Sequence, residues 1–472
     1  MTALASEPAG RDASNTEFSF PLSEAQIGIW NAQHIAPQVP LTVAQYVEIH
    51  GEFDASVLGR AMRLCAADLQ SLRLRIVEVA GEPRQLVGPD SPIEVVPHDF
   101  RSCADPRAAA MSWMRRDAAV PIPVLGDRLF ETAALRVGDD EYLWYAKMHH
   151  IAIDGYGAML LVARIAEHYT ALIGGTAASP VVARDLYSIY ESERDYRDSE
   201  QFERDRQFWS ERLAAIGSEF SLSDRHGPVG AERLIEGGLL DPAATAELAA
   251  VRSRFGASRP ALLTAGVVAY LAAVTGRQEV TLSLPVTART TAGLRMSAGY
   301  VSNVVPLHFE VTGDHSIEDL VGRVDPGIRD ALRHQRYRHE DMARDRGAAG
   351  TDRGFLGPVV NIMLFHNGIR FGNAAATMHL LSTGPVEDLS VNIYNGSGDG
   401  ELHIDFIGNP ARYTVDELRA HHGRFLAFLA DFLSAAPPTR VSELSVLGAA
   451  ERQLVLRDWA LTPAVAADGG FA

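Results

Sequence analysis

The stretch MHHIAIDG, residues 148–155, stands where a predicted strand gives way to a predicted helix. The aromatic and apolar residues 142–147 predict a buried strand, and the apolar positions at helical spacing in 156–169 predict a helix. Side chains alternate along a strand, so the histidines at 149 and 150 are expected on opposite faces, one toward a cavity and one toward the core. Asp154 is near enough in sequence for its carboxylate to brace the turn. Gly155 permits a backbone conformation closed to other residues.

Three interpretations of this stretch compete. A metal site is disfavoured, because adjacent strand histidines diverge and no third ligand follows at a suitable spacing. A purely structural role is the usual one for an isolated histidine. Here, however, the whole pattern His-His-x-x-x-Asp-Gly joins a potential base, a carboxylate and a flexible turn. We therefore interpret the stretch as a catalytic turn without a metal.

Length and composition exclude several classes of protein. The 472 residues are enough for two or three lobes, and the formal net charge of −17 argues against a nucleic-acid partner, which requires a basic face. Cys65 and Cys103 make no disulfide framework and fit a reducing cytosol, so we expect a cytoplasmic protein. Residues 260–276 approach membrane-spanning length, but threonine, glycine and tyrosine interrupt them. We expect a buried helix there and no membrane contact.

The pattern along the chain predicts two lobes of alternating strands and helices, that is, an α/β fold. We expect a disordered N-terminal arm over 1–17, an N-terminal lobe over 18–190 and a C-terminal lobe over 191–445. The remaining residues, 446–472, are linker-like, and their end from 464 onward is expected to be disordered. The highly charged stretch 185–213 predicts helices that link the two halves.

Two further features bear on the site. Residues 72–76 alternate strictly, which predicts a strand with Arg73 and Arg75 on one face; Asp154 is a candidate carboxylate partner. A second histidine pair, His421 and His422, lies inside a predicted helix that is capped at residues 414–417. We expect those two histidines to be ordinary packing or surface residues.

Five motifs in order carry a resemblance. They are SEAQIGIW at 23–30, SLR at 71–73 (after DLQ where Arg-His-Glu is usual), the histidine stretch at 149–155, GYVSN at 299–303 and HQRY at 334–337. Together they resemble the condensation domains of nonribosomal peptide synthetases, within the chloramphenicol-acetyltransferase-like superfamily. The resemblance runs over about residues 18–459.

Three stretches narrow the resemblance to the opening condensation domains of siderophore synthetases. They are GIW at 28–30, GPVVNI at 357–362 and TGPV at 383–386. Such domains accept an aryl-acyl starter, which the resemblance implies here. The sequence contains no adenylation core and no carrier-protein serine motif. We therefore expect a condensation domain cut out of, or standing beside, a larger synthetase with an adjacent adenylation domain.

The resemblance implies two acetyltransferase-like lobes in a V-shaped pseudodimer, with a tunnel at their junction. It also implies amide-bond formation between a donor acyl or peptidyl thioester and the amine of an acceptor aminoacyl thioester. Both substrates would arrive on phosphopantetheine arms of peptidyl or aryl carrier proteins, so no covalently bound cofactor is expected. The resemblance gives catalytic roles to His150 and Gly155 and structural roles to His149, Asp154 and Arg73.

Gln26, Ser302 and Asn303 are expected, through the same resemblance, to line the tunnel or bind substrate. Whether His150 acts as a base, as a positioning group or electrostatically stays open. One alternative function also stays open: a free-standing acyltransferase of the same superfamily that uses an acyl-coenzyme A and a small alcohol or amine.

Overall fold

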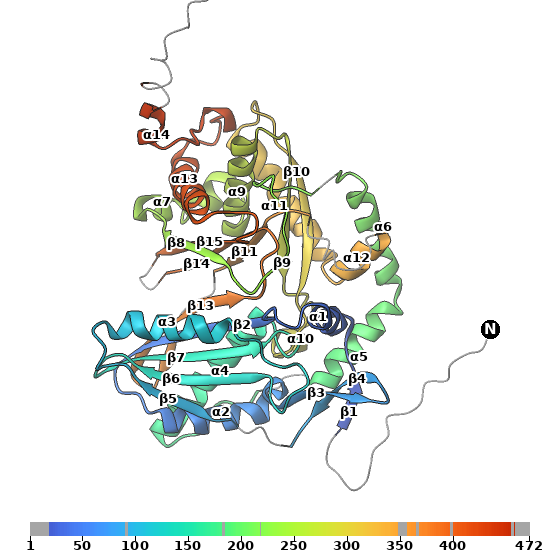
Figure 1. The fold of residues 1–472 in the computed structure, drawn as a ribbon. Helices are drawn as coiled ribbons and strands as arrows, with labels where there is room; N and C mark the ends of the chain where they lie inside the picture. Colours follow the sequence, from blue (N-terminus) through green and yellow to red (C-terminus); the bar gives the residue numbers. More distant parts are fainter. Residues whose placement is uncertain are drawn as a thin grey trace, which may run out of the picture.

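The computed structural model of the chain has two lobes, one above the other in Figure 1. It describes residues 18–89, 93–181, 185–217, 219–347, 356–364, 368–396, 400–454 and 457. The predicted arm, 1–17, and the predicted disordered end, 464–472, lie outside the described residues. Strands and helices occur together in both lobes, which confirms the predicted α/β class.

The N-terminal lobe is built on a six-stranded sheet of order β12-β13-β2-β7-β6-β5. Its strands, in that order, are Ile369–Phe371, Ala374–Thr383, Thr42–His50, Glu141–His149, Phe130–Arg136 and Val95–Asp99. Only the β5–β6 pair among them is parallel. Because side chains alternate along β2, one face packs against α2 (Ala55–Asp68) and α4 (Gly155–Gly174), and the other against α3 (Pro106–Ala118).

A smaller sheet of order β1-β4-β3 lies beside this one. Its strands are Phe18–Pro21, Glu82–Val87 and Leu74–Val79. Helix α1 (Glu24–Ile35) begins with a complete capping box between Ser23 and Gln26, as the sequence predicts. The short 3₁₀ helix η1, Gln70–Arg73, precedes β3.

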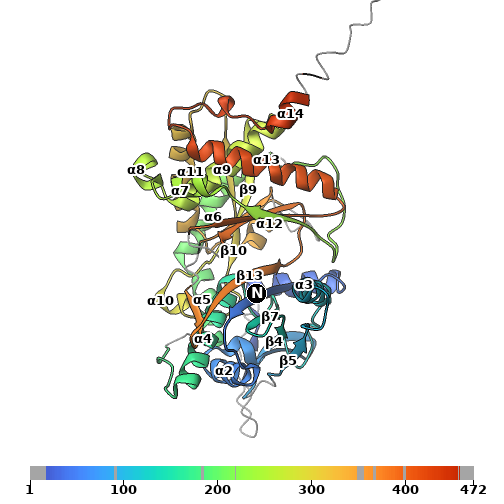
Figure 2. The ribbon, with the colours of Figure 1, turned by 90° about the vertical axis from the view of Figure 1, so that its left-hand side faces the viewer.

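The C-terminal lobe contains a second six-stranded sheet, of order β10-β9-β11-β14-β15-β8. Its strands, in that order, are Asn303–Glu310, Glu279–Val286, Val359–Met363, Leu389–Asn395, Leu402–Gly408 and Leu234–Leu239. Its helices include α7 (Pro242–Glu247), α9 (Arg259–Thr275), α11 (Ile317–Arg333) and α13 (Val415–Ser434). Buried side chains of α9, α11 and α13 form one core with this sheet, and Figure 2 shows α13 lying across it.

The predicted helical link consists of α5 (Leu186–Arg197) and α6 (Glu200–Leu213), which run along the side of both lobes (Figure 1). The remaining short helices belong to the C-terminal half: α8 (Val251–Phe255), α10 (Ala292–Arg295), α12 (His339–Asp345), η2 (Val441–Glu443) and α14 (Ala449–Leu454). The predicted buried helix at 260–276 is α9, whose residues from Ala261 to Ala272 are all buried. Among the residues that the structure describes, no helix has the length and apolar character needed to span a membrane.

The sequence-based division of the chain at residue 190 did not include a segment of the C-terminal half that joins the N-terminal lobe. Residues 369–383 belong to the C-terminal half of the sequence, yet they form β12 and β13 of the N-terminal sheet. β13 pairs with β2 from Ala375 to Thr383, and Figure 2 shows it between the lobes. This strand therefore ties the two lobes together and forms part of the wall between them.

The second histidine pair has the packing role predicted from the sequence. Both residues lie inside α13, which begins with the capping box between Thr414 and Glu417. A ring nitrogen of His422 lies 3.0 Å from the carbonyl oxygen of Ile404, and His421 contacts the hydroxyl of Tyr270. These contacts hold α13 against its own lobe.

Candidate active site

The turn between β7 and α4 places its two histidines in different surroundings. His149 is completely buried. The backbone N–H of Ile151 donates to its Nδ1 at 3.1 Å, and its Nε2 lies 3.2 Å from the side-chain oxygen of Gln33. Burial first, and then the charge of the neighbouring His150, lower the pKa of His149 to about 3. His149 is therefore neutral, with Nε2–H donating to Gln33.

His150 is partly exposed and faces a cavity, so the two histidines diverge as predicted. Its Nδ1 lies 3.2 Å from the carbonyl oxygen of Ile153, and its Nε2 lies 3.3 Å from that of Thr383. The ring also meets Tyr300 edge-to-face at 5.6 Å. A neutral imidazole carries one N–H, which we assign to Nδ1 because Ile153 belongs to the same turn. The lone pair of Nε2 then lies beside the carbonyl oxygen of Thr383, at the border of the cavity.

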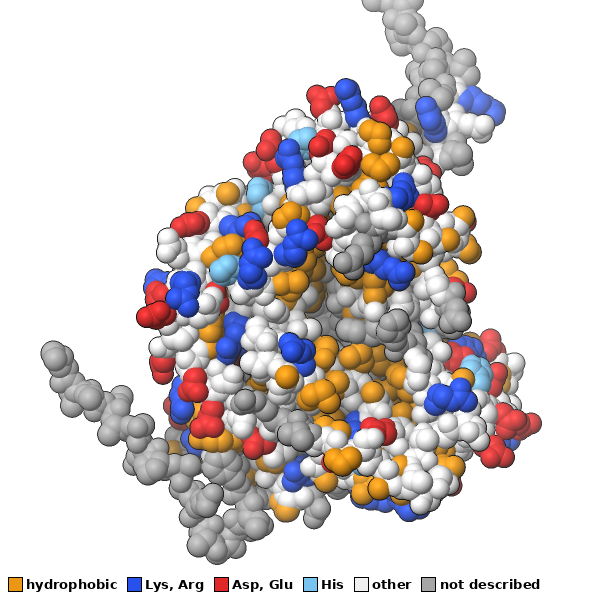
Figure 3. Space-filling view, turned by 180° about the vertical axis from the view of Figure 1, so that it is seen from behind, with side chains coloured by type: hydrophobic (Ala, Val, Ile, Leu, Met, Phe, Trp, Pro, Cys, Tyr) orange, Lys and Arg blue, Asp and Glu red, His pale blue; other side chains and the backbone are white. Residues whose placement is uncertain are grey.

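The cavity has a volume of about 320 Å³ and takes its walls from both lobes. β2, β13 and the start of α4 contribute from the N-terminal lobe, and β11 and β14 from the C-terminal lobe. Along β11, Val360 points into the core while Val359 and Asn361 border the cavity, as strand alternation requires. Figure 3 shows hydrophobic side chains gathered around the hollow between the lobes.

Asp154 holds the turn from its buried side. Its carboxylate caps α4 by accepting the backbone N–H of Gly157 at 2.8 Å. Both terminal nitrogens of Arg289 donate to the same carboxylate, at 2.8 and 3.0 Å. Burial acts to raise the pKa of Asp154, but the charge and hydrogen bonds of Arg289, with backbone N–H donors, outweigh it and lower the pKa. The carboxylate is therefore ionised.

The predicted pairing of Asp154 with Arg73 is wrong. Arg73 ends the 3₁₀ helix η1, so the strand alternation begins only at Leu74 and does not place Arg73 and Arg75 together. The guanidinium of Arg73 donates to the carbonyl oxygens of Ala66 at 2.8 Å and Gly88 at 2.7 Å. Arg73 thus joins the end of α2 to the loop after β4, away from Asp154.

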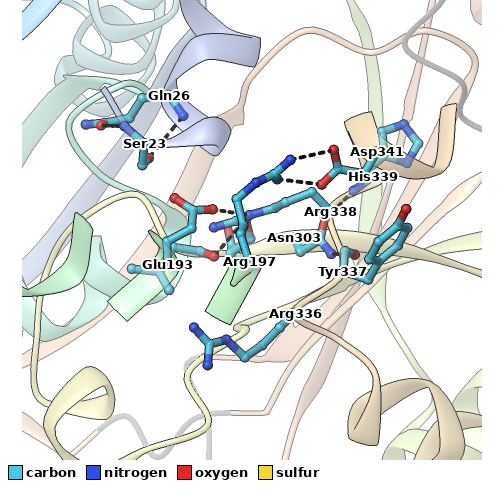
Figure 4. A network of polar contacts seen from close by, with 12 residues as sticks. Ser23, Gln26, Glu193, Arg197, Asn303, Arg336, Tyr337, Arg338, His339 and Asp341 are labelled. Carbon is cyan, nitrogen blue, oxygen red and sulfur yellow. Dashed lines mark hydrogen bonds and ion pairs between the residues drawn. The ribbon is translucent and has the colours of Figure 1, made fainter. Parts of the chain in front are cut away.

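The motif at 299–303 is clamped between two charged groups. Asp154 accepts the backbone N–H groups of Val301 and Ser302, at 2.9 and 2.8 Å. Arg338 donates to the carbonyl oxygens of the same two residues, at 3.0 and 2.8 Å. Figure 4 shows Arg338 also paired with Glu193 of α5, at 2.7 Å. One short peptide segment is therefore held on both sides.

Asn303 explains why the fourth and fifth motifs meet. Its side-chain nitrogen donates to the carbonyl oxygens of Gln335 and Tyr337, at 3.0 and 2.7 Å. Its side-chain oxygen accepts the backbone N–H of His339 at 3.0 Å (Figure 4). Asn303 and Ser302 border the cavity, and the amide of Asn303 is used to fasten β10 to the chain before α12.

Gln26 was expected along the tunnel, and that prediction is wrong. Its side chain is buried and is not among the described residues that line the cavity. Its amide nitrogen donates to Gln85 at 2.9 Å and to the carbonyl oxygen of Ile151 at 3.0 Å. Gln26 therefore braces the turn between β7 and α4 from behind.

Three glycines lie at or near the turn: Gly155, Gly157 and Gly384. Gly155 is the first residue of α4, lacks a positive φ, and has open space where a Cβ would lie, so the predicted special conformation is wrong. It borders the cavity. A Cβ on Gly157 would lie 2.8 Å from Ile153. Gly384 has φ +98°, and a Cβ there would lie 3.3 Å from the ring of His150.

A family model described as Condensation domain matches residues 17–456, nearly the whole chain. The chain belongs to the condensation-domain family. It is thus an amide-bond-forming acyltransferase of the nonribosomal peptide synthetase type. Two solved structures are similar over 91% of this condensation domain, each with a TM-score of 0.84. They are the starter condensation domain of rhizomide synthetase, 32% identical, and the first condensation domain of the calcium-dependent antibiotic synthetase, 31% identical; 98% and 99% of those chains are covered.

Curated relatives of this condensation domain are much longer proteins. It is 33% identical to the dimodular nonribosomal peptide synthase of Bacillus subtilis (strain 168), with 94% of the chain and 19% of the relative covered. It is 35% identical to the isonitrile lipopeptide synthase of Streptomyces coeruleorubidus, with 90% and 29% covered. For enterobactin synthase component F of Escherichia coli O157:H7 the identity is 30%, with 89% and 32% covered. The chain thus spans a fifth to a third of these relatives.

Sequence reasoning missed two groups of this condensation domain that meet the turn between β7 and α4. Arg289 lies in the loop after β9, and its only sequence signal is a cation that follows an apolar strand. The carbonyl of Thr383 reaches His150 because β13 crosses into the N-terminal sheet. The stretch at 383–386 was noticed for its resemblance, but its place beside His150 depends on the fold.

Proposed function

We propose that this condensation domain joins a donor acyl thioester to the amine of an aminoacyl thioester, each carried on the phosphopantetheine arm of a carrier protein. The observation that carries the proposal is the convergence of two acceptors at the cavity wall. They are Nε2 of His150 and the carbonyl oxygen of Thr383, 3.3 Å apart. An amine that enters the cavity beside them would find an acceptor for two of its N–H groups.

The two acceptors match what amide formation requires. The nitrogen lone pair of the neutral amine attacks the thioester carbonyl carbon, a C–N bond forms and the C–S bond breaks. The amine loses one proton, and the departing thiolate gains one. His150 takes up the amine proton at Nε2 or orients the amine there; general-base catalysis of this kind contributes roughly 10²–10⁴-fold. Holding both thioesters in one cavity supplies a further part of the rate.

The first turn of α4 is proposed to stabilise the oxyanion of the tetrahedral intermediate. Gly155 borders the cavity at the N-terminus of that helix. The first backbone N–H groups of a helix have no partner within the helix, and its dipole favours negative charge there. The missing side chain of Gly155 leaves space for the substrate to approach them.

The donor is proposed to be a starter acyl group, in the first condensation step of a synthetase. Two observations support this. The starter condensation domain of rhizomide synthetase, solved in complex with C8-CoA and Leu-SNAC, is 32% identical to this chain. Enterobactin synthase component F is 30% identical to it. A siderophore product, a neighbouring adenylation domain and a tunnel open at both ends belong to the same proposal. So does a cytoplasmic location, which the free thiols of Cys65 and Cys103 favour.

The experiment that tests the proposal is intact-mass analysis of an acceptor carrier protein after incubation with loaded donors. The alternative, a free-standing acyltransferase, differs mainly in its acceptor. A related starter domain has been solved with an acyl-coenzyme A, so donor form alone does not separate the two functions. We expect acylation of an aminoacyl group on its carrier, with little product from the same amino acid free in solution. Equal turnover of free amines would favour the alternative.

A further inference from the structure

Gln45 of β2 is a buried polar side chain at the wall of the cavity. It is 1% exposed, borders the cavity, and its amide nitrogen has no hydrogen-bond partner among the described residues. Its cross-strand neighbours are Ala146 on β7 and Leu380 on β13. A buried amide without a partner is costly, and most native structures avoid it. The side chain borders the cavity, so a ligand group there can supply the partner once the amide turns toward it.

The walls around Gln45 are otherwise suited to an apolar group. Val43, Met159, Met378 and Leu380 border the same cavity from the N-terminal lobe. Asn361 faces it from β11, but its amide nitrogen already donates to Asn392 at 3.2 Å. Gln45 thus offers an unused polar group within the part of the wall that β2, β13 and α4 form, among aliphatic and thioether side chains.

We infer that Gln45 recognises a hydroxyl group on the donor acyl chain or ring. A hydroxyl both donates and accepts, so it pairs with either end of the amide. The inference rests on the proposed function, because it concerns the acyl group that this cavity receives. A wholly hydrocarbon donor leaves the amide unpaired and binds less tightly, which makes Gln45 a specificity-determining residue.

The test compares matched acyl-pantetheine thioesters that differ by one hydroxyl: octanoyl with 3-hydroxyoctanoyl, and benzoyl with 2-hydroxybenzoyl. Dissociation constants are measured by calorimetry, and turnover is measured by intact mass. We expect wild type to bind at least one hydroxylated member about tenfold more tightly than its partner. Gln45→Leu should bind both members alike. The pair that shows the preference tells whether the hydroxyl is carried on a chain or on a ring.

Thr42→Val is the matched control. Thr42 lies on the same strand, and its hydroxyl is also buried without a partner, but it is not among the residues that line the cavity. This variant should keep the hydroxyl preference. The inference is overturned if wild type binds the two members of each pair equally, or if the preference for the hydroxylated member survives Gln45→Leu. It is also overturned if the preference is shown only for hydroxylated acceptors. Tight hydroxyl-dependent binding without amide formation supports the inference while contradicting the proposed function.

Discussion

Asp154 and Arg289 form a two-point ion pair across 135 residues of sequence, with nitrogen–oxygen distances of 2.8 and 3.0 Å. Both side chains are almost completely buried. Asp154 caps the helix that follows the turn after β7, and Arg289 lies in the loop after β9, with its guanidinium 4.8 Å from the ring centre of Tyr156. The pair therefore fastens the turn of one lobe to the sheet of the other.

Removing one partner of this pair should mainly lower the free energy of unfolding, with any effect on the rate of amide formation secondary to it. Asp154→Asn leaves the guanidinium of Arg289 buried beside a neutral amide, and a buried pair broken from one side typically loses about 3–5 kcal/mol. We expect a lower free energy of unfolding and a lower soluble yield, measured by chemical denaturation. Because the folded-state pKa of Asp154 is lowered, its stabilising contribution is complete above the pKa of the unfolded chain. It should be lost as the pH falls through the folded-state value.

Arg73→Ala is the comparison for that measurement. It removes hydrogen bonds to backbone carbonyls at a partly exposed site and strands no buried charge. We expect the free energy of unfolding of Arg73→Ala to fall by no more than about 1–2 kcal/mol. An Asp154→Asn variant with an unchanged unfolding curve and no activity would instead assign Asp154 directly to catalysis.

His150→Ala should fold normally and lose most amide formation. Its ring lies at the cavity wall, with Nε2 beside the carbonyl of Thr383, so the loss should reach about 10²–10⁴-fold if the imidazole moves the amine proton. His150→Gln keeps a polar group without a base of similar strength. A loss shared equally by the two variants indicates proton transfer, whereas recovery in the glutamine variant indicates positioning of the amine.

The control for His150 is His421→Ala. His421 of α13 packs against Tyr270 of α9. We expect the rate of acylation of the carrier to stay near that of wild type. Near wild-type turnover in His150→Ala itself would remove His150 from the mechanism.

Gly384→Ala should lower the rate by moving His150. The residue has φ +98°, which alanine adopts only with strain, and the added Cβ would lie 3.3 Å from Cδ2 and 3.6 Å from Nε2 of the imidazole. Misplacing a catalytic group by this kind of contact costs about ten- to a hundredfold in turnover. Gly81→Ala carries a similar positive φ, +85°, with open space around it. Both variants should lose stability, but only Gly384→Ala should lose activity out of proportion.

The buried His149 should make the fold less stable in acid. Its folded-state pKa is about 3, below the ordinary value of 6.5, so the unfolded chain binds the proton more readily. The stabilising contribution is complete above pH 6.5 and falls by about 1.4 kcal/mol for each unit below that. His149→Gln retains a donor for Gln33 and an acceptor for Ile151 but does not titrate. Denaturation curves from pH 7.5 to 5 should show a smaller pH slope for the variant; equal slopes would contradict this assignment.

The sequence alone determined the local features of the site. The strand, the turn, the helix that Asp154 caps and the divergence of His149 and His150 all follow from patterns within about twenty neighbouring residues. Such patterns are informative because backbone periodicity and capping are short-range effects. The same reasoning separated His421 and His422, inside a capped helix, from the histidines of the turn.

The tertiary structure decided which distant residues meet the turn. The chain has 60 aspartate and glutamate residues and 43 lysine and arginine residues, so charge alone did not select Arg289 over Arg73 as the partner of Asp154. The crossing of β13 into the N-terminal sheet brings Thr383 to His150 and Leu380 beside Gln45. These contacts depend on chain topology, which local sequence patterns do not report. Burial then makes the contacts important for stability, because a charge or an amide removed from water needs a partner nearby in the folded structure.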